Sequence, residues 1–323
     1  MSLTAEQTEW FSQTFAQLVA NVEQAIVGKT EVVRLAFVAL LAEGHLLLED
    51  YPGTGKTSLA RAIAQTIQGE HHRIQFTPDL LPSDVTGVTI YDQRAQEFEF
   101  HKGPIFSNVV LADEINRASP KTQSALLEVM EESQVTVDGI THAVAPPFIV
   151  IATQNPIEQA GTYRLPEAQL DRFLIKTSLG YPDHENTVQI LANAPKGKAA
   201  TVVRPIISGD NVLHLIQLAQ QVHVEPAIYE YVSSLIENVR TAPEVVLGTS
   251  VRAGLALVRA ARAWAISYGR SYVVPDDVKT LAVPVLAHRM VLDPEEDFRG
   301  TTTEDVVRKV LERVSVPLEP AAR

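Results

Sequence analysis

The sequence predicts an α/β protein in which a parallel sheet is flanked by helices, followed by a smaller all-helical domain. Three observations support this prediction. First, up to residue 180 short apolar runs alternate with longer segments whose apolar residues have helical spacing. Second, a glycine-containing loop separates the first apolar run from the next helix. Third, strand patterns nearly vanish after residue 180. Parallel strands need long crossover connections, which are usually helices. We therefore expect an α/β domain at residues 1–180 and a helical domain at residues 181–323.

The composition excludes several classes of protein. A chain of 323 residues with 46% hydrophobic and 20% charged residues is an ordinary globular protein of about two domains. Its net charge of −12 argues against a main role in coating nucleic acid or anionic membranes. The chain has no cysteine, no basic residue before Lys29 and no apolar run of membrane-spanning length. We therefore expect a cytoplasmic protein without disulfides.

The secondary-structure elements follow from the spacing of apolar residues. Residues up to about 43 repeat apolar side chains at helical spacing and predict two helices, broken near Gly28. Apolar runs rich in Val, Ile and Phe predict strands at 45–49, 73–76, 109–112, 147–152 and 173–177. Helices are expected after the glycine loop, with Leu59, Ile63 and Ile67 buried, and from Ser119-Pro120, with Leu126, Val129 and Met130 buried.

Two β-hairpins interrupt this alternation. The first joins Val88–Tyr91 to Glu97–Phe100, and the second joins Val135–Val137 to Ile140–Ala143 across the turn Asp138-Gly139. Beyond residue 183 the sequence predicts helices that begin near Pro226 and Pro275, and an exposed loop at 194–198.

The strongest local signal is a strand, a glycine-containing loop and a helix that starts with Lys-Thr. Such a loop directs backbone N–H groups and the positive end of a helix dipole toward phosphates. We expect Lys56 to reach the β- and γ-phosphates and Thr57 to ligate Mg²⁺. The strict pattern has Gly where Asp50 stands, so the Asp50 carboxylate must point away from the phosphates. The residues expected to bind nucleotide are Pro52, Gly53, Thr54, Gly55, Lys56, Thr57 and Ser58. The alternative is a glycine-rich turn with no ligand.

Polar residues follow two further predicted strands. Asp113 and Glu114 end the 109–112 strand, where one carboxylate can join a metal and the next can polarise an attacking water. Asn155 follows the 147–152 strand and can contact a γ-phosphate or that water. Each signal alone is weak, but together with the phosphate loop they predict an ATP-hydrolysing site.

The motifs together resemble the MoxR family of AAA+ ATPases over about residues 20 to 295. After the loop Gly-x-Gly-Lys-Thr come GPIF (103–106), ADEINRA (112–118), PKTQSALLEVMEE (120–132), ATQNP (152–156), GTYRLPEAQLDRF (161–173) and SVRA (250–253). The resemblance implies a P-loop AAA+ core with a helical lid, ATP with Mg²⁺ as cofactors, and a homo-oligomeric, usually hexameric ring. It also implies chaperone-like work on a protein partner, often a von Willebrand factor A domain protein.

The resemblance also implies roles for single residues. Lys56 and Thr57 match Walker A, and Asp113 and Glu114 match Walker B. Asn155 matches sensor 1, and Arg252 in SVRA matches sensor 2. Arg172 is the expected arginine finger, although Arg164, where the family more often has Pro, is a second candidate. The apolar segment Ile26, Val27 and Gly28 matches the one that lines the adenine pocket.

We therefore interpret the chain as an Mg²⁺-dependent AAA+ ATPase that remodels or matures a protein partner. Two alternatives stay open: a nucleic-acid-dependent motor, which the acidic composition disfavours, and a nucleotide-binding scaffold with little turnover.

Overall fold

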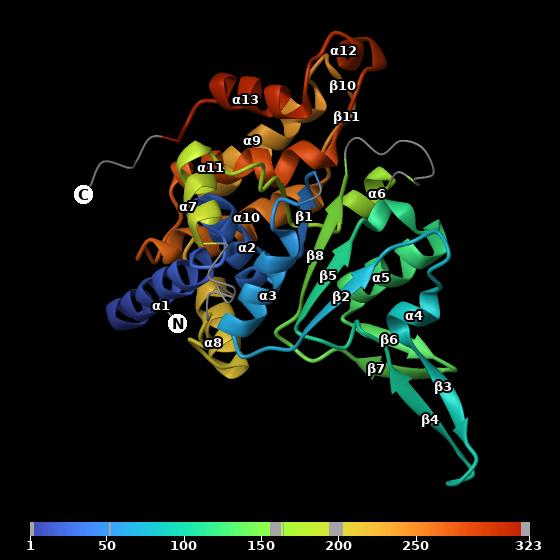
Figure 1. Ribbon diagram of the computed structural model, residues 1–323. Helices are drawn as coiled ribbons and strands as arrows, with labels where there is room; N and C mark the ends of the chain where they lie inside the picture. Colours follow the sequence, from blue (N-terminus) through green and yellow to red (C-terminus); the bar gives the residue numbers. More distant parts are fainter. Residues whose placement is uncertain (1–2, 52, 156–162, 164, 194–202, 318–323) are drawn as a thin grey trace. The chain divides into compact units, whose positions relative to one another are not determined.

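The computed structural model describes residues 3–51, 53–155, 163, 165–193 and 203–317. Its central feature is a five-stranded sheet in the order β2-β5-β8-β1-β9, and the pairs β2-β5, β5-β8 and β8-β1 are parallel (Figure 1). The predicted fold class is confirmed. The five strands are β1 (Leu46–Glu49), β2 (His71–Gln75), β5 (Val109–Asp113), β8 (Ile149–Gln154) and β9 (Ile175–Thr177).

Contacts divide the chain into two compact units that interleave along the sequence. Unit 1 comprises residues 1–16, 166–176 and 214–323, and unit 2 comprises residues 17–165 and 177–213. The boundary falls within α1 (Ala5–Glu23), β9 and α8 (Gly209–Gln220). The predicted domain boundaries, 1–180 and 181–323, stay a prediction.

Unit 2 holds most of the sheet and the helices that connect its strands. Strands β1, β5 and β8 are apolar and buried almost throughout, as expected of strands covered on both faces. Helix α3 packs against β5 and β2, and Leu59, Ile63 and Ile67 are fully buried. The helices of this unit are α2 (Thr30–Leu41), α3 (Lys56–Thr66), α4 (Pro82–Thr86), α5 (Pro120–Glu132) and α7 (His184–Asn193).

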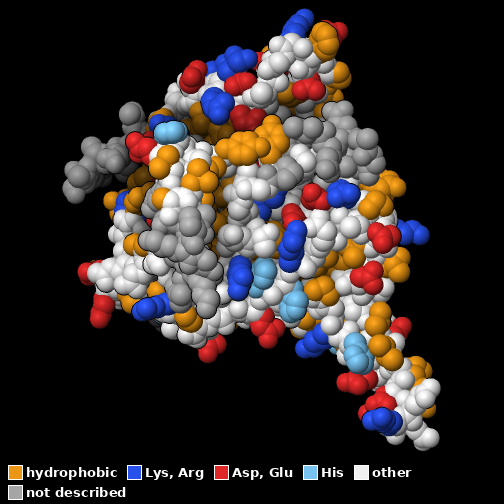
Figure 2. Space-filling view, viewed as in Figure 1, with side chains coloured by type: hydrophobic (Ala, Val, Ile, Leu, Met, Phe, Trp, Pro, Cys, Tyr) orange, Lys and Arg blue, Asp and Glu red, His pale blue; other side chains and the backbone are white. Residues whose placement is uncertain are grey.

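Both predicted hairpins are present in unit 2. Strands β3 (Gly87–Asp92) and β4 (Glu97–Lys102) form one, and β6 (Gln134–Val137) and β7 (Ile140–Ala143) form the other. Asp138 and Gly139 both have positive φ, as a two-residue turn of this kind requires. The hairpins touch, because β3 contacts β6 and the ring of Phe100 stacks on that of His142. Hydrophobic and charged side chains both reach the surface of the β3-β4 hairpin (Figure 2).

Unit 1 is mainly helical, and its core lies between α9, α10, α11 and α13. Helices α9 and α11 begin at Pro226 and Pro275, as the sequence predicts. The sequence did not predict the small antiparallel pair β10 (Val245–Leu247) and β11 (Val291–Leu292). The helical elements are α6 (Glu167–Leu170), α9 (Pro226–Arg240), α10 (Val251–Ser267), α11 (Pro275–Leu286), η3 (Ala287–Arg289), α12 (Pro294–Phe298) and α13 (Thr303–Arg313).

Two further predictions depend on which residues are described. The loop predicted at 194–198 lies outside the described residues. Within the described part of the chain, no helix is both long enough and apolar enough to cross a bilayer.

Candidate functional site

The loop between β1 and α3 forms an open turn at the carboxyl end of the sheet. Gly53 and Gly55 have φ values of +83° and +99°, a left-handed conformation that glycine adopts without strain. A Cβ added at Gly53 would meet no atom within 4 Å, so the space beside the loop is open. Helix α3 starts directly after Gly55, and the first N–H groups of a helix have no partner within it. The loop therefore has the features of an anion-binding turn.

Lys56 lies back against its own loop. Its side chain is buried, and Nζ donates to the carbonyl oxygens of Asp50 at 3.2 Å and Tyr51 at 3.1 Å. Thr57 and Ser58 are exposed, whereas Thr54 is buried and its hydroxyl donates to the Tyr51 carbonyl. An ammonium has three protons, and a charged phosphate oxygen would compete for them with these two neutral carbonyls. Pro52 lies outside the described residues.

The predicted adenine-lining segment lies next to this loop. Ile26 is buried, and its Cδ1 atom is 3.6 Å from the position of a Cβ added at Gly55. Val27 is half-buried, and Gly28 is exposed with a φ of +74°. A side chain at Gly28 would overlap the amide of Asn186 at the start of α7. The structure thus brings one apolar wall to the phosphate loop.

Asp113, at the end of β5, is held by two neighbours. Its Oδ1 atom accepts from the Thr153 hydroxyl at 2.6 Å, and Oδ2 accepts from Nε and Nη2 of Arg73 at 3.1 Å and 2.7 Å. Its side chain is only 11% exposed. These contacts fix the orientation of the Asp113 carboxylate at the carboxyl end of β5.

Glu114 turns the chain sharply after β5. Its backbone has the left-handed values φ 57° and ψ 51°, which are uncommon for a residue with a side chain. The Glu114 N–H donates to the Thr153 hydroxyl at 2.8 Å. The Oε2 atom accepts from Gln75 Nε2 at 2.8 Å and from Arg117 Nη1 at 2.9 Å. Strained backbone of this kind gathers at functional sites, and here it aims a half-buried carboxylate held by two donors.

Asn155 completes the group within unit 2. It follows β8 directly and is buried. Because β8 lies between β5 and β1 and runs parallel to both, their carboxyl ends meet at one edge. The structure therefore gathers the phosphate loop, the Asp113-Glu114 pair and Asn155 there.

The two predicted arginines belong to unit 1. Arg172 is half-buried in the turn between α6 and β9, and Arg252 is exposed in the first turn of α10. Ser250 occupies the N-cap position of α10, but the described structure shows no capping hydrogen bond from its side chain. The placement of both arginines relative to the phosphate loop stays a prediction. Arg164 lies outside the described residues.

Sequence reasoning missed the residues that hold the carboxylates in place. Thr153 and Arg117 lie inside two of the motifs, ATQNP and ADEINRA, so the signal for them was present. Arg73 and Gln75 lie on β2, and Gln75 pairs in register with Asp113. Only the order of the strands brings these two residues to the site.

The donor set suits Mg²⁺. Thr57 offers a hydroxyl and Asp113 a carboxylate, and Mg²⁺ prefers such oxygen ligands together with substrate phosphates and water. The described residues contain no cluster of three or more His, Cys, Asp or Glu side chains able to hold a metal by themselves.

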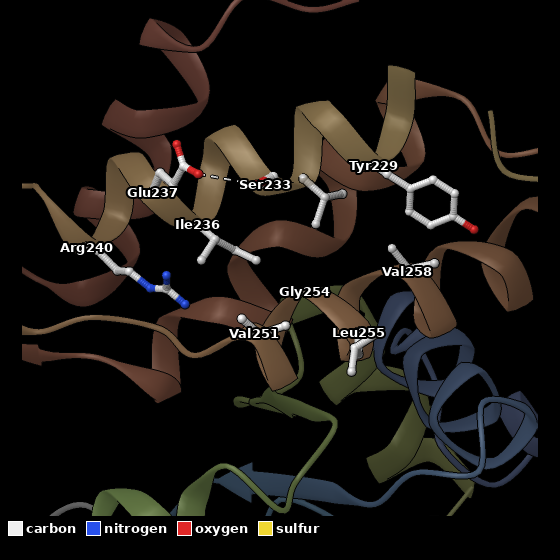
Figure 3. Close-up of a pocket in the computed structure, with 10 residues that line it drawn as sticks. Tyr229, Ser233, Ile236, Glu237, Arg240, Val251, Gly254, Leu255 and Val258 are labelled. Carbon is white, nitrogen blue, oxygen red and sulfur yellow. Dashed lines mark hydrogen bonds between the residues drawn. The ribbon is translucent and has the colours of Figure 1, made fainter. Parts of the chain in front are cut away.

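A separate cavity of about 210 Å³ lies in unit 1, between α9 and α10 (Figure 3). Its lining is largely apolar and includes Ile236, Val251 and Leu255, with Arg240 at one end. Gly254 allows the two helices to approach, because a Cβ there would lie 2.5 Å from Cδ1 of Ile236. None of the predicted site residues is among the described residues that line it.

Comparison with known proteins agrees with this geometry. Residues 45–175 match the ATPase family associated with various cellular activities (AAA), and residues 237–310 match the AAA lid domain. The uncharacterized protein YeaC of Bacillus subtilis is 49% identical over 94% of this chain and 95% of its own. The chaperone MoxR1 of Mycobacterium tuberculosis is 41% identical over 94% of this chain and 82% of its own.

The fold has a close counterpart among solved structures. A crystal structure of a candidate ATPase from Cytophaga hutchinsonii superposes with a TM-score of 0.91 at 37% identity, over 97% of this chain and 98% of that one. The parallel sheet, the phosphate loop and the helical lid define an AAA+ ATPase fold. Within that class the chain belongs to the MoxR family, as its identity to MoxR1 and to the MoxR protein of Methylorubrum extorquens shows.

Proposed function

We propose that this protein hydrolyses ATP in an Mg²⁺-dependent reaction and uses the energy to remodel or mature a protein partner. The observation that carries the proposal is that an open phosphate loop, whose glycines have left-handed backbone, lies at the carboxyl end of the sheet together with Asp113 and Glu114, both oriented by hydrogen bonds. Membership of an ATPase family supports it independently.

Each residue of the group has a role that its environment suits. The loop N–H groups and Lys56 compensate the phosphate charge, and Glu114 takes a proton from the attacking water. Asn155 orients that water or the γ-phosphate. Thr57 and Asp113 would hold Mg²⁺, which when bound neutralises charge that develops on the phosphates.

The residues of unit 1 complete the proposal. Arg172 acts as the arginine finger on a neighbouring subunit's nucleotide, with Arg164 as the other candidate, and Arg252 acts as sensor 2. The arginine-finger role requires a homo-oligomer, for which we propose a hexameric ring in the cytoplasm. A von Willebrand factor A domain protein is the partner we would test first, and the homologue named as a chaperone supports such a role.

The test separates binding of nucleotide from turnover. We expect Lys56→Ala to abolish ATP binding, because Lys56 acts on phosphate charge in the ground state. Glu114→Gln should keep ATP binding and lower kcat by roughly 10²- to 10⁴-fold, the usual contribution of a general base. Calorimetry gives the affinities, and phosphate release with and without EDTA gives the turnover and its Mg²⁺ dependence.

The control and the alternatives use the same assays. Glu97→Gln, on the exposed β4 strand, should leave both quantities unchanged. Equal loss of ATP affinity in the Lys56 and Glu114 variants would contradict the assigned roles. Binding without turnover in the wild type would favour a nucleotide-binding scaffold, and turnover that depends on added DNA or RNA would favour a nucleic-acid motor. The Glu114→Gln protein also serves to capture the partner.

A further inference from the structure

Asp50 joins the phosphate loop to the segment that follows β9. The residue is 2% exposed, and its side chain accepts three hydrogen bonds from that segment. Oδ1 accepts from the Ser178 hydroxyl at 2.9 Å and the Gly180 N–H at 2.8 Å, and Oδ2 accepts from the Leu179 N–H at 2.6 Å. Hydrogen bonds to an ionised acceptor are about twice as strong as neutral ones. The carboxylate therefore fastens residues 178–180 to the start of the loop.

Tyr51, the residue after Asp50, also contacts the segment that follows β9. The Tyr51 ring stacks on that of Tyr181, with centroids 5.8 Å apart and planes 9° from parallel. The Tyr181 carbonyl accepts from Lys29 Nζ at 2.8 Å. We call residues 178–181 the linker, because they lead from β9 toward α7 in unit 2. The linker is thus held by Asp50 and Tyr51, the first two residues after β1.

The backbone of the same two residues contacts Lys56. Its Nζ donates to the Asp50 and Tyr51 carbonyls, so Asp50 touches Lys56 through its main chain and the linker through its side chain. A phosphate bound in the loop attracts the Lys56 ammonium away from these neutral carbonyls, because a charged acceptor forms the stronger bond. Residues 50 and 51 then lose a contact, and their shift acts on the linker through the Asp50 carboxylate.

A buried carboxylate is costly unless its partners compensate it. The loop pattern needs only a glycine at this position, which carries no such cost. The structure nevertheless places there a carboxylate whose three hydrogen-bond donors all lie in the linker.

We propose that Asp50 is a positioning residue that couples occupancy of the phosphate loop to the conformation of the linker 178–181. The proposal rests on the proposed function, because it takes the loop to be the ATP phosphate site. Asp50 does not touch the reacting atoms; it acts through Lys56 on one side and through the linker on the other.

The test uses a reporter on the linker side. The chain has no cysteine, so His184→Cys, at the exposed start of α7, gives a single site for an environment-sensitive fluorophore. In the labelled protein we expect a slowly hydrolysed ATP analogue with Mg²⁺ to change the fluorescence. Asp50→Asn replaces one acceptor oxygen by an N–H₂ group, which cannot accept the linker N–H. The variant should bind the analogue within about threefold of the wild type but respond much less, with kcat about 3- to 30-fold lower, the range of measured coupling effects.

The controls separate coupling from simple stability. Asp92→Asn is matched, because the Asp92 carboxylate also accepts from two backbone N–H groups, those of Arg94 and Ala95, in the β3-β4 turn. It should leave both the response and kcat unchanged. Ser178→Ala removes one of the three bonds at an exposed residue and should reduce the response in part, which keeps the test valid if Asp50→Asn does not fold.

Each outcome decides the proposal. A full fluorescence response and normal kcat in folded Asp50→Asn, with only a lower Tm, would show that Asp50 merely stabilises the fold and would overturn it. If calorimetry shows that the wild type binds no nucleotide, the proposed function fails and this proposal fails with it. If the wild type binds and hydrolyses ATP but Asp50→Asn responds normally, only the coupling proposal is wrong.

Discussion

Thr153 shows how one buried hydroxyl can position two carboxylate residues. It is fully buried in β8, donates to Asp113 Oδ1 and accepts from the Glu114 N–H. A hydroxyl can donate one hydrogen bond while it accepts another. Thr153 can therefore bond both residues, Asp113 at the end of the neighbouring strand β5 and Glu114 directly after it. The position of Asp113, the proposed metal ligand, and the unusual backbone of Glu114 therefore depend on the same oxygen atom.

We expect Thr153→Val to weaken the proposed Mg²⁺ site, although valine and threonine have nearly the same shape. The variant keeps the shape of the side chain but leaves the Glu114 N–H and Asp113 Oδ1 without this partner, which costs about 1–3 kcal/mol of stability per buried group. The Mg²⁺ concentration for half-maximal ATPase activity should rise, because the Asp113 carboxylate loses one of its two orienting contacts. Thermal unfolding and an Mg²⁺ titration of activity measure the two effects.

Thr153→Ser is the matched control for this prediction. It keeps the hydroxyl and removes one methyl group, worth about 0.8 kcal/mol of burial. It should therefore lower Tm slightly and leave the Mg²⁺ dependence unchanged. If both variants show the same Mg²⁺ dependence as the wild type, the hydroxyl has no part in positioning Asp113.

The positions of the candidate site residues could be predicted from the sequence, whereas the supports that come from β2 could not. Lys56, Asp113 and Asn155 each follow an apolar strand or a glycine loop at a recognisable spacing. Arg73 and Gln75 carry no local pattern, because their role depends on β2 lying beside β5. Asp50 was visible only as a departure from the glycine pattern, and its three partners lie about 130 residues further along the chain.

At the scale of elements, a buried cluster in unit 1 fixes the turn that carries Arg172. The guanidinium of Arg289, in η3, pairs with the Asp171 carboxylate at 2.7 Å and donates to the Phe173 carbonyl at 2.6 Å. His288 Nε2 lies 3.0 Å from the same carbonyl. Asp171 and Phe173 flank Arg172 in the sequence, so η3 holds the backbone on both sides of the predicted arginine finger.

This cluster should make stability depend on pH. Burial, reinforced by the neighbouring Arg289 charge, lowers the pKa of His288 well below 6.5. The folded protein therefore keeps His288 neutral, while the unfolded chain takes up a proton below about pH 6.5. Because the unfolded state binds more protons there, the free energy of unfolding falls as pH drops below about 6.5, by up to ~1.4 kcal/mol per pH unit until the folded-state pKa is reached.

His288→Gln is the variant that checks this effect. It keeps an N–H donor for the Phe173 carbonyl but cannot titrate, so its stability should fall less steeply between about pH 6.5 and 5 than that of the wild type. Urea unfolding midpoints across this pH range measure the slopes. His101→Gln, at an exposed residue of β4, should keep the wild-type slope. A wild-type slope in His288→Gln would assign the pH dependence to other groups.

The elements themselves could be predicted well wherever one periodicity dominates. Strands β1, β5 and β8 are continuous apolar runs, and the turn Asp138-Gly139 marks the second hairpin. The β10-β11 pair was missed, because strands of three and two residues are too short to show a period of two. The predicted last strand starts at 173, but Phe173 and Leu174 precede β9 and their carbonyls accept from Arg289 instead.

At the scale of the whole molecule, the proposed mechanism needs more than one copy of the chain. The phosphate loop and both carboxylates belong to unit 2, whereas Arg172 belongs to unit 1. If Arg172 acts on the nucleotide of a neighbouring subunit, a subunit with a dead phosphate loop still supplies a working finger, and a subunit without the finger still supplies a working loop. Each active site then lies between two subunits, so mixing two inactive proteins can restore activity.

We therefore expect Arg172→Ala to bind ATP nearly as the wild type does and to lower kcat by about 10³-fold, the lower end of arginine-finger effects. Mixing it with Lys56→Ala should restore part of the activity, because some interfaces then combine an intact loop with an intact Arg172. Native mass spectrometry confirms that mixed assemblies form, and phosphate release measures the rescue across mixing ratios. Arg259→Ala, an exposed arginine on α10, is the control and should leave kcat unchanged. If mixed assemblies form and no ratio restores activity, Arg172 does not act between subunits, and Arg164 becomes the residue to test.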